Sequence, residues 1–445
     1  MTGVSCSDPD SVSYDDADSP PDAGLLPPPP SVSWTTARFG GLPRSFWFLW
    51  TGTIVNKAGT FITPFLTLYL TGERDVSVQQ AGLVLACLGL GSAIGQPLGG
   101  VLADRIGRRR TMVLGLLLSA VTLLTLGAAD RLALVAVAAF AYGLCLDLFR
   151  PAVQAAVADL VSDTDRPRAF ALQFWASNLG FSIATPLGGY LATRGFWLLF
   201  VLDAIASVAF ALLILRGVPD TRSAVAGAVG HVREVLYDTL MLSVVACSLA
   251  MWVVYMQAYV TLPLAFAADD LGPGTYGAAI ALNGVLIIVL QPLVLGRLSR
   301  WRRGPLLLVA MLLEGLGFGL TVFADSVPMH LLAIAIWTAG EVFAAGQLAG
   351  LVVHLAPLHL RGRYLGTFGF AFGAAALLAP LVGTQVLARA GEPVLWSGSL
   401  VLCALAGVGL LRLSAAAERR PGSGVQPMPV SRCGVPRQRR EEPTS

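Results

Sequence analysis

Long apolar segments with almost no charge make up most of this chain, and they constrain its fold more than any other feature. Each is close to the roughly 20 residues that an α-helix needs to cross a bilayer. The membrane interior offers no water to bond backbone polar groups, so such segments fold as helices. We predict an all-α membrane protein with twelve transmembrane helices, at residues 45–70, 78–102, 111–129, 132–158, 168–193, 195–216, 236–266, 275–298, 305–324, 327–355, 363–389 and 393–413.

The composition excludes a water-soluble globule. Apolar residues make up 55% of the 445 residues and charged residues only 13%, whereas a soluble domain carries about 25% charged residues. The net charge of +3 gives no indication of nucleic-acid binding. The six cysteines are scattered without paired spacing, which argues against a disulfide framework or a metal site.

Polar segments divide the chain into five parts. Residues 1–43 are acidic and rich in Pro and Ser, and residues 414–445 are basic and rich in Arg, Pro and Gly, so we expect both tails to be disordered. The longest internal polar break predicts a cytoplasmic linker at 217–235. This linker separates an N-terminal six-helix bundle, 44–216, from a C-terminal six-helix bundle, 236–413.

The arginines indicate which loops face the cytoplasm, where loops carry an excess of basic residues. If both termini are inside, the inward loops hold Arg105, Arg108, Arg109, Arg110, Arg166, Arg168, Arg216, Arg222, Arg233, Arg297, Arg300, Arg302, Arg303, Arg361 and Arg363. The outward loops hold only Arg74, Arg131, Arg194 and Arg389. We therefore predict a multi-pass protein of the bacterial inner or plasma membrane, with both termini cytoplasmic.

The two halves repeat each other at a nearly constant offset. The tripeptide Gln-Pro-Leu at 96–98 recurs at 291–293, and the same offset places Arg105 on Arg300. At one residue less, Phe149 falls on Phe343 and Pro186 on Pro380. A parallel repeat of this kind is typical of transporters with two pseudo-symmetric six-helix bundles and a site between them.

A loop rich in glycine and arginine follows the second predicted helix. It reads Gly100-Val101-Leu102-Ala103-Asp104-Arg105-Ile106-Gly107-Arg108-Arg109-Arg110. This loop resembles the signature of the major facilitator superfamily, G-x-L-x-D-R-x-G-R-R, and the resemblance covers about residues 44–413. The residues that carry the cytoplasmic gating motif are Gly100, Asp104, Arg105, Gly107, Arg108 and Arg109. The corresponding loop of the second half matches this motif only in part, because Ser299 stands where the first half has Asp104.

The resemblance implies the major facilitator fold, in which helices 1, 4, 7 and 10 line a cavity and the halves rock about it. It also implies that Asp104 latches the cytoplasmic side of the outward-facing state. The helix 4 segment 148–155 is similar to the arginine-centred motif of the superfamily. Helix 5 looks like the helix-bend motif of drug:proton antiporters, carried here by Gly180, Pro186, Gly188 and Gly189.

Charged residues inside the apolar segments are the candidates for proton coupling. Asp147, Arg150 and Gln154 share one face of helix 4, because they are spaced by three and four residues. Asp147 is either a proton-exchanging carboxylate or half of a static ion pair with Arg150. Glu341 occupies almost the same repeat position in helix 10, and it either serves a proton or cationic substrate or makes buried structural hydrogen bonds.

Further polar and aromatic residues are candidates for the substrate cavity. Lys57, the only lysine, requires an acidic partner such as Asp147 or Glu341, or it favours an anionic group on the substrate. Aromatic side chains suit broad hydrophobic ligands, although ordinary helix packing is the alternative for each. The full set is Asn56, Lys57, Trp175, Trp252, Tyr255, Gln257, Tyr259, Asn283 and Trp337. We assign structural roles to Asp203 and Glu314.

These features favour a secondary active transporter that exports small hydrophobic or amphipathic compounds by alternating access, driven by protons. The alternatives are a carrier for a narrow polar metabolite, such as an amino acid, sugar or organic anion, and a non-transporting membrane sensor. The four histidines lack metal-ligand spacing and no P-loop is present, so we expect no enzyme activity, metal or cofactor. The expected partners are a small-molecule substrate, protons and the lipid bilayer, with a functional monomer and no nucleic acid.

Overall fold

The computed structural model describes residues 41–162, 165–220, 235, 237–298, 301–357 and 360–420. Most of the predicted tails, 1–43 and 414–445, and of the predicted linker, 217–235, therefore lies outside the described residues. The helix predicted to end at residue 413 continues to Glu418.

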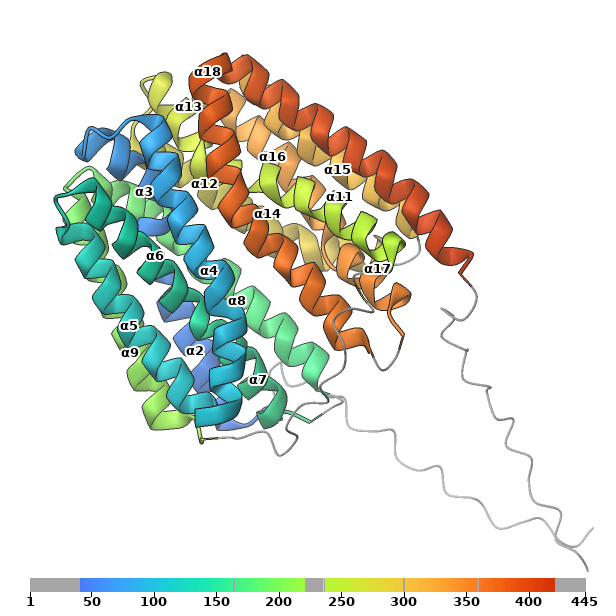
Figure 1. Cartoon of the computed structure of the whole chain (residues 1–445), viewed down its shortest axis with the longest axis horizontal. Helices are drawn as coiled ribbons and strands as arrows, with labels where there is room; N and C mark the ends of the chain where they lie inside the picture. The colour runs from blue at the N-terminus through green and yellow to red at the C-terminus, as the bar shows by residue number, and fades with distance from the viewer. Residues whose placement is uncertain are drawn as a thin grey trace, which may run out of the picture. The chain divides into compact units, whose positions relative to one another are not determined.

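The described residues fold into helices and contain no strand (Figure 1). The first helix group comprises α2 (Arg44–Ala58), α3 (Ile62–Leu68), a π-helix (Tyr69–Glu73), α4 (Val78–Ile106), α5 (Arg108–Ala128), α6 (Leu132–Leu148), α7 (Arg150–Leu160), α8 (Arg166–Ala192) and α9 (Phe196–Gly217). The second helix group comprises α11 (Thr239–Tyr255), α12 (Gln257–Val260), α13 (Leu262–Ala268), α14 (Pro273–Leu298), α15 (Arg303–Leu320), a 3₁₀ turn (Thr321–Phe323), α16 (Val327–Ala344), α17 (Gln347–Leu355) and α18 (Arg361–Glu418).

The predicted all-α membrane fold is confirmed. Within the described ranges, nine helical segments are long and apolar enough to cross a membrane. The longest element, α18, has 58 residues, and its backbone leaves the helical conformation at Gly391, where φ is 81°. At about 1.5 Å per residue, it is too long for one pass through a bilayer core of about 30 Å. The count of twelve membrane spans stays a prediction.

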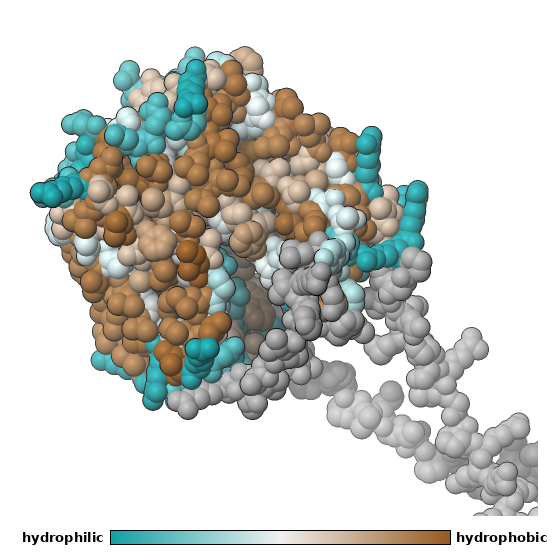
Figure 2. Space-filling view, in the orientation of Figure 1, coloured by the Kyte–Doolittle hydropathy of each residue, from teal (hydrophilic) through white to brown (hydrophobic). Residues whose placement is uncertain are grey.

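The outer faces of the helices carry large apolar side chains. Val121, Val137 and Leu405 each expose 60% or more of their surface. Figure 2 shows apolar residues across the middle of the visible face and hydrophilic residues gathered at its ends. This distribution suits a hydrocarbon surrounding, because water would not favour so large an apolar surface.

Four of the predicted transmembrane helices are interrupted. The first breaks at residues 59–61 between α2 and α3, and the fourth at Phe149 between α6 and α7. The seventh breaks at Met256 and Thr261, and the tenth at residues 345–346, where Gly346 has a φ of 74°. These are helices 1, 4, 7 and 10, which the family resemblance assigns to the central cavity.

Pro186 and Pro380 do not interrupt a helix, because α8 and α18 continue through these residues. A proline removes one backbone donor, but a membrane helix tolerates it where nearby groups compensate. Breaks do precede Pro64 and Pro263, since α3 and α13 each begin one or two residues before the proline.

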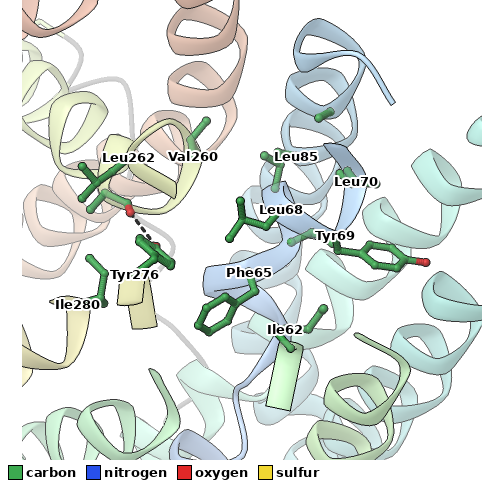
Figure 3. Close-up of a cluster of buried hydrophobic side chains, with 14 of the residues drawn as sticks. Ile62, Phe65, Leu68, Tyr69, Leu70, Leu85, Val260, Leu262, Tyr276 and Ile280 are labelled. Carbon is green, nitrogen blue, oxygen red and sulfur yellow. Dashed lines mark hydrogen bonds between the residues drawn. The ribbon is translucent and has the colours of Figure 1, made fainter. Parts of the chain in front are cut away.

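The two helix groups meet at one end of the bundle. Thr67 of α3 donates a hydrogen bond to the Tyr259 carbonyl oxygen at 3.2 Å, and the rings of Phe65 and Tyr276 meet edge to face at 5.5 Å (Figure 3). Tyr276 also donates to the Ala258 carbonyl oxygen at 2.9 Å. Buried apolar residues from both groups surround these contacts, so this end is sealed.

Small residues bring the groups together at the same end. Gly82 and Gly89 of α4 lie against Thr384 and Ala376 of α18, and Gly277 of α14 lies against Thr185 of α8. Among the described residues, the hydrogen bond and the ring contacts that join the groups lie toward this sealed end. Figure 2 shows the surface hollowed between the groups at the opposite end.

The start of α11 is tied to the two ends of α18. The Asp238 carboxylate accepts hydrogen bonds from the Met241 amide at 3.2 Å, the Tyr364 hydroxyl at 2.8 Å and Arg420 Nη1 at 2.7 Å. Burial alone would raise the pKa of Asp238, but these hydrogen bonds and the Arg420 charge outweigh it and lower the pKa below its ordinary value.

We expect Gly89→Leu to open the sealed end. No space exists for a side chain between Gly89 and Ala376, and overpacking costs about 1–3 kcal/mol. The maleimide labelling rate of Thr67→Cys, with the six native cysteines replaced by serine, should rise on the order of tenfold. Gly398→Leu is the control, because Gly398 is an exposed glycine of α18 that faces open space. Equal labelling in the two variants would contradict the close contact.

We expect Asp238→Asn to lower the free energy of unfolding at pH 7 by about 1–3 kcal/mol, because a charged acceptor of three hydrogen bonds is lost. A lowered pKa contributes stability above the unfolded value, near 4, that disappears as pH falls through the folded value. The difference in melting midpoint between the wild type and Asp238→Asn should therefore become smaller below about pH 4. Asp130→Asn, whose side chain is 93% exposed, should change little at any pH.

Candidate substrate and proton site

The break in helix 4 positions the first candidate acid. Pro151 lies in the first turn of α7, where it has no amide hydrogen and its ring would clash with the Asp147 carbonyl of a continuous helix. Asp147 is 3% exposed, and its Oδ1 lies 2.8 Å from Arg150 Nη1. Ser92 of α4 donates a hydrogen bond to the other carboxylate oxygen. The predicted pairing of Asp147 with Arg150 is thus present, with a third partner.

Lys57 lies in the last turn of α2, just before the break in helix 1. It is within electrostatic range of Asp147, Arg150 and Asp203. Across the described ranges, its side-chain ammonium group forms no hydrogen bond or ion pair with another residue. Glu341, the other partner considered from the sequence, is not among its electrostatic neighbours.

Asp203 of α9 is a neighbour of Lys57 that supports the same break. Its carboxylate is 2% exposed and faces the backbone amides of Phe61 and Ile62, where α3 begins. Asn56 donates a hydrogen bond to Ser207 of α9 at 3.3 Å. Asn56 thus makes the interhelical contact that was one of its two predicted roles.

Glu341 is the centre of a polar cluster in the second helix group. Asn283 of α14 donates from Nδ2 to Glu341 Oε2 at 2.8 Å and to Thr338 Oγ1 at 3.0 Å. The Tyr255 hydroxyl lies against the same carboxylate. Glu314 of α15, which is 1% exposed, is a further electrostatic neighbour of Glu341. Three of the predicted candidates, Glu341, Asn283 and Tyr255, are therefore in one place.

An aromatic wall continues from this cluster. The Tyr255 ring meets Trp252 at 5.6 Å, Tyr259 at 5.8 Å and Trp337 at 6.0 Å, all nearly edge to face. The wall extends to Phe372 of α18 beside Trp252 and to Phe181 of α8 beside Tyr259. Trp252, Tyr255 and Tyr259 are partly exposed, whereas Trp337 is 1% exposed and packs behind them.

The Trp252 indole nitrogen has no hydrogen-bond partner in the part of the chain that the structure describes, although it is buried. Tyr255 and Tyr259 share a hydrogen bond between their hydroxyls at 3.2 Å. The wall therefore offers apolar ring faces beside the Glu341 carboxylate. This arrangement can hold an amphipathic molecule with a polar or cationic group.

Two predicted cavity residues lie elsewhere. Gln257 is 2% exposed and donates to the Val253 and Ala379 carbonyl oxygens, each at 3.1 Å, so it joins α12 to α18. Trp175 of α8 stacks on Trp50 with ring centroids 6.4 Å apart, away from the Glu341 cluster.

The gating motif joins four elements at the end opposite the sealed one. Arg108, at the start of α5, pairs with Asp104 of α4 and, at 3.4 Å, with Asp159 of α7. Arg109 donates to the Leu215 carbonyl oxygen of α9, and Gly107 packs against Asp220. Gly100 and Arg105 face open space or solvent. Asp104 keeps 64% of its side chain exposed, so it is available for other contacts.

The glycines of the helix 5 motif support close packing. Gly180 lies against Lys57 and the backbone of α2, and Gly188 lies against Phe65. Gly189 faces the Pro273 carbonyl oxygen of the second group. Pro186 lies inside the continuous helix between them.

Sequence reasoning missed several partners in these clusters. Ser92, Thr338 and Asp159 are absent from the predicted site, as are Phe181 and Phe372. Asp159 carried one usable signal, because it lies at a helix end near the arginine-rich loop. The others are common residue types whose role depends on tertiary packing alone.

Comparisons with known proteins agree with this architecture. A family model of the Major Facilitator Superfamily matches residues 49–380 and 240–432. The MFS-type transporter YqjV of Bacillus subtilis is 25% identical over 384 residues, covering 82% of this chain and 91% of YqjV. The multidrug resistance protein MdtH of Salmonella typhimurium is 25% identical over 338 residues, with 74% and 83% covered. A Na(+), Li(+), K(+)/H(+) antiporter of Planococcus maritimus is 23% identical over 364 residues, with 74% and 85% covered.

Solved transporter structures share the fold. The peptide transporter POT in complex with sulfate superposes with a TM-score of 0.73 at 17% identity, covering 86% of this chain and 96% of that one. A D-xylose-proton symporter gives a TM-score of 0.68 at 16% identity, with 82% and 96% covered. At these identities the likeness concerns the fold.

The fold and the broken cavity helices define a multi-pass membrane transporter. The chain belongs to the Major Facilitator Superfamily.

We expect Arg108→Gln to destabilise the protein by about 1–3 kcal/mol, because two carboxylates lose a shared, 8% exposed partner. Arg105→Gln is the matched control, since the Arg105 side chain is exposed. Melting midpoints of the purified variants in detergent provide the measurement. A midpoint for Arg108→Gln equal to that of Arg105→Gln would show that the network adds no stability.

Proposed function

We propose that this protein is a proton-coupled exporter of small hydrophobic or amphipathic compounds. It lies in the bacterial cell membrane with both termini in the cytoplasm, and it acts by alternating access between two six-helix bundles, 44–216 and 236–413. The observation that carries the proposal is a single carboxylate, Glu341, set beside a partly exposed aromatic wall.

Competition between a proton and the exported compound for the Glu341 carboxylate couples the movement of one to that of the other. Asn283 donates a hydrogen bond to Glu341 at 2.8 Å, and a cationic group of a bound compound beside Tyr255 would pair with the ionised carboxylate. A bound compound and a proton would then exclude each other at one site. This exclusion makes exchange of one for the other the productive cycle.

The described conformation fits the loading step of this cycle. In the predicted orientation, the open end faces the cytoplasm, and the end sealed by Thr67, Phe65, Tyr259 and Tyr276 faces outward. A compound enters from the cytoplasm, displaces the proton from Glu341 and packs against the wall. Opening of the sealed end releases it, and a proton from outside returns to Glu341.

The relatives support this assignment in part. The names of the MdtH proteins include multidrug resistance, and that of the Planococcus maritimus protein states cation/proton antiport. The structural neighbours carry peptides, nucleosides or D-xylose by their titles, and at their low identity they support the fold alone.

A second candidate function is a carrier for a small organic anion. Lys57 forms no ion pair in the described ranges, and Arg150 lies within its electrostatic range. Two neighbouring cations would suit a carboxylate or phosphate group on the cargo. Asp147 and Asp203 oppose this reading, because they already supply negative charge there.

Uptake of a fluorescent cationic dye by efflux-deficient cells tests the proposal. We expect cells with the wild-type protein to hold less dye than empty-vector cells, and an uncoupler to remove the difference. Glu341→Gln should remove the difference as well, because it eliminates the exchangeable proton. Asp147→Asn should reduce it through loss of the ion pair with Arg150.

Glu73→Gln, a carboxylate-to-amide change at an exposed position, is the matched control and should export normally. Dye levels equal to those of empty-vector cells across a chemically varied panel, at confirmed expression, would refute the exporter. The anion carrier would then be tested by uptake of radiolabelled carboxylates, comparing the wild type with Lys57→Gln.

A further inference from the structure

A polar cavity lies apart from the Glu341 cluster, at the open end of the second helix group. Its volume is about 320 Å³, and it lies between the start of α15, helix α17 and the end of α18. Its walls include Trp301, Arg303, Gln347, His354, Ser414 and Glu418. A cavity of this size can hold a phosphate group or a small organic anion.

Three buried polar atoms in this wall lack a hydrogen-bond partner in the part of the chain that the structure describes. They are Arg303 Nε, His354 Nε2 and Ser414 Oγ. Ser414 is 3% exposed, so water outside the cavity does not solvate it. Unsatisfied buried polar atoms are costly and indicate an occupant that is able to bond them.

The first helix group shows what fills the equivalent place. Arg108 is the first residue of α5, and Asp159 is the penultimate residue of α7. Arg303 and His354 hold the same positions in α15 and α17, each 195 residues later. Arg108 bonds two carboxylates, Asp104 and Asp159.

Both carboxylates are missing from the second half. The same 195-residue offset replaces Asp104 by Ser299 and Asp159 by His354, so the arginine is retained without either acid. Arg303 therefore occupies a position built for a guanidinium with negative partners, but none of the described residues accepts a hydrogen bond from its Nε.

The remaining charges leave the cavity positive. Glu418 is the acid in the wall, and it is shared by two arginines, because it pairs with Arg302 at 3.2 Å and is an electrostatic neighbour of Arg303. Helix α15 begins at Arg303 with no acid in its first turn and no side-chain cap. A helix start without a cap adds partial positive charge and free backbone donors.

We propose that this cavity, which we call the Arg303 pocket, binds a phosphate-bearing anion in place of the lost carboxylates. Arg303 supplies charge-assisted hydrogen bonds, and His354 and Ser414 complete the set of donors. The anion is either the headgroup phosphate of an anionic phospholipid or a soluble phosphate, since both present the same oxygens. Trp301, exposed by 58% at the rim, suits the level of lipid headgroups.

Titration of the purified full-length protein with inorganic phosphate, against chloride at equal ionic strength, tests the pocket in detergent. We expect phosphate to raise the melting midpoint of the wild type. Arg303→Gln should weaken phosphate binding on the order of tenfold or more, the effect of losing a charge-assisted hydrogen bond. Arg412→Gln, an exposed arginine on α18, is the matched control and should bind as the wild type does.

His354→Asp separates loss of binding from loss of folding. It restores the acid found at Asp159, so it should keep or raise the melting midpoint while abolishing the response to phosphate. Misfolding could not produce this combination of a retained midpoint and a lost response.

A lipid arm distinguishes the source of the anion. The protein is reconstituted in nanodiscs of phosphatidylcholine alone or with one quarter phosphatidylglycerol, and retained lipid is measured by native mass spectrometry. Retention of phosphatidylglycerol by the wild type and Arg412→Gln, but not by Arg303→Gln or His354→Asp, assigns the pocket to a headgroup. A phosphate response without such retention assigns it to a soluble phosphate. Absence of both, or equal responses in Arg303→Gln, overturns the proposal.

Discussion

Inside a bilayer, a backbone group that leaves a helix must be bonded by protein or water, and this requirement limits where membrane helices can break. In this protein the breaks fall on four helices that surround one interior. Lys57, Asp147, Tyr255 and Glu341 each lie within about a turn of a break. The helix breaks and the charged side chains lie close together for one reason, since both need hydrogen-bond partners that lipid cannot supply. The site is therefore where the fold can accommodate polarity.

Most of the helix positions could be predicted from apolar runs of membrane length. The turn between the predicted eleventh and twelfth helices is visible at Gly391, even though the backbone hydrogen bonding is nearly continuous there. The break at Phe149 was missed inside a predicted helix, although Pro151 was a readable signal. The break at 345–346 depends on Gly346 in a left-handed conformation, and a glycine alone does not reveal its φ in advance. At Pro186 and Pro380 the opposite holds: a proline is present, yet the helix continues through it, because a membrane helix tolerates proline where nearby groups compensate.

The candidate site could be predicted as a set of residue types, but not as a set of partners. Helical spacing placed Asp147 beside Arg150 and aligned Tyr255 with Tyr259, because one helix carries each pair. Contacts between different helices could not be predicted from the sequence. Asn283 reaches Glu341 across 58 residues, and Ser92 reaches Asp147 across 55. Gln257 shared the polarity of the other candidates but points to Ala379, and only packing decides that direction.

The central claim is that one carboxylate is shared by protons and cargo. Proteoliposomes containing the purified protein and a trapped pH indicator test this most directly, with a cationic dye added outside and no pH gradient imposed. The account predicts that dye movement into the vesicles drives protons out, so that the interior becomes more alkaline in the wild type. Vesicles with Glu341→Gln should show no change. Dye movement without any change of internal pH, or an equal pH change with Glu341→Gln, would contradict the account.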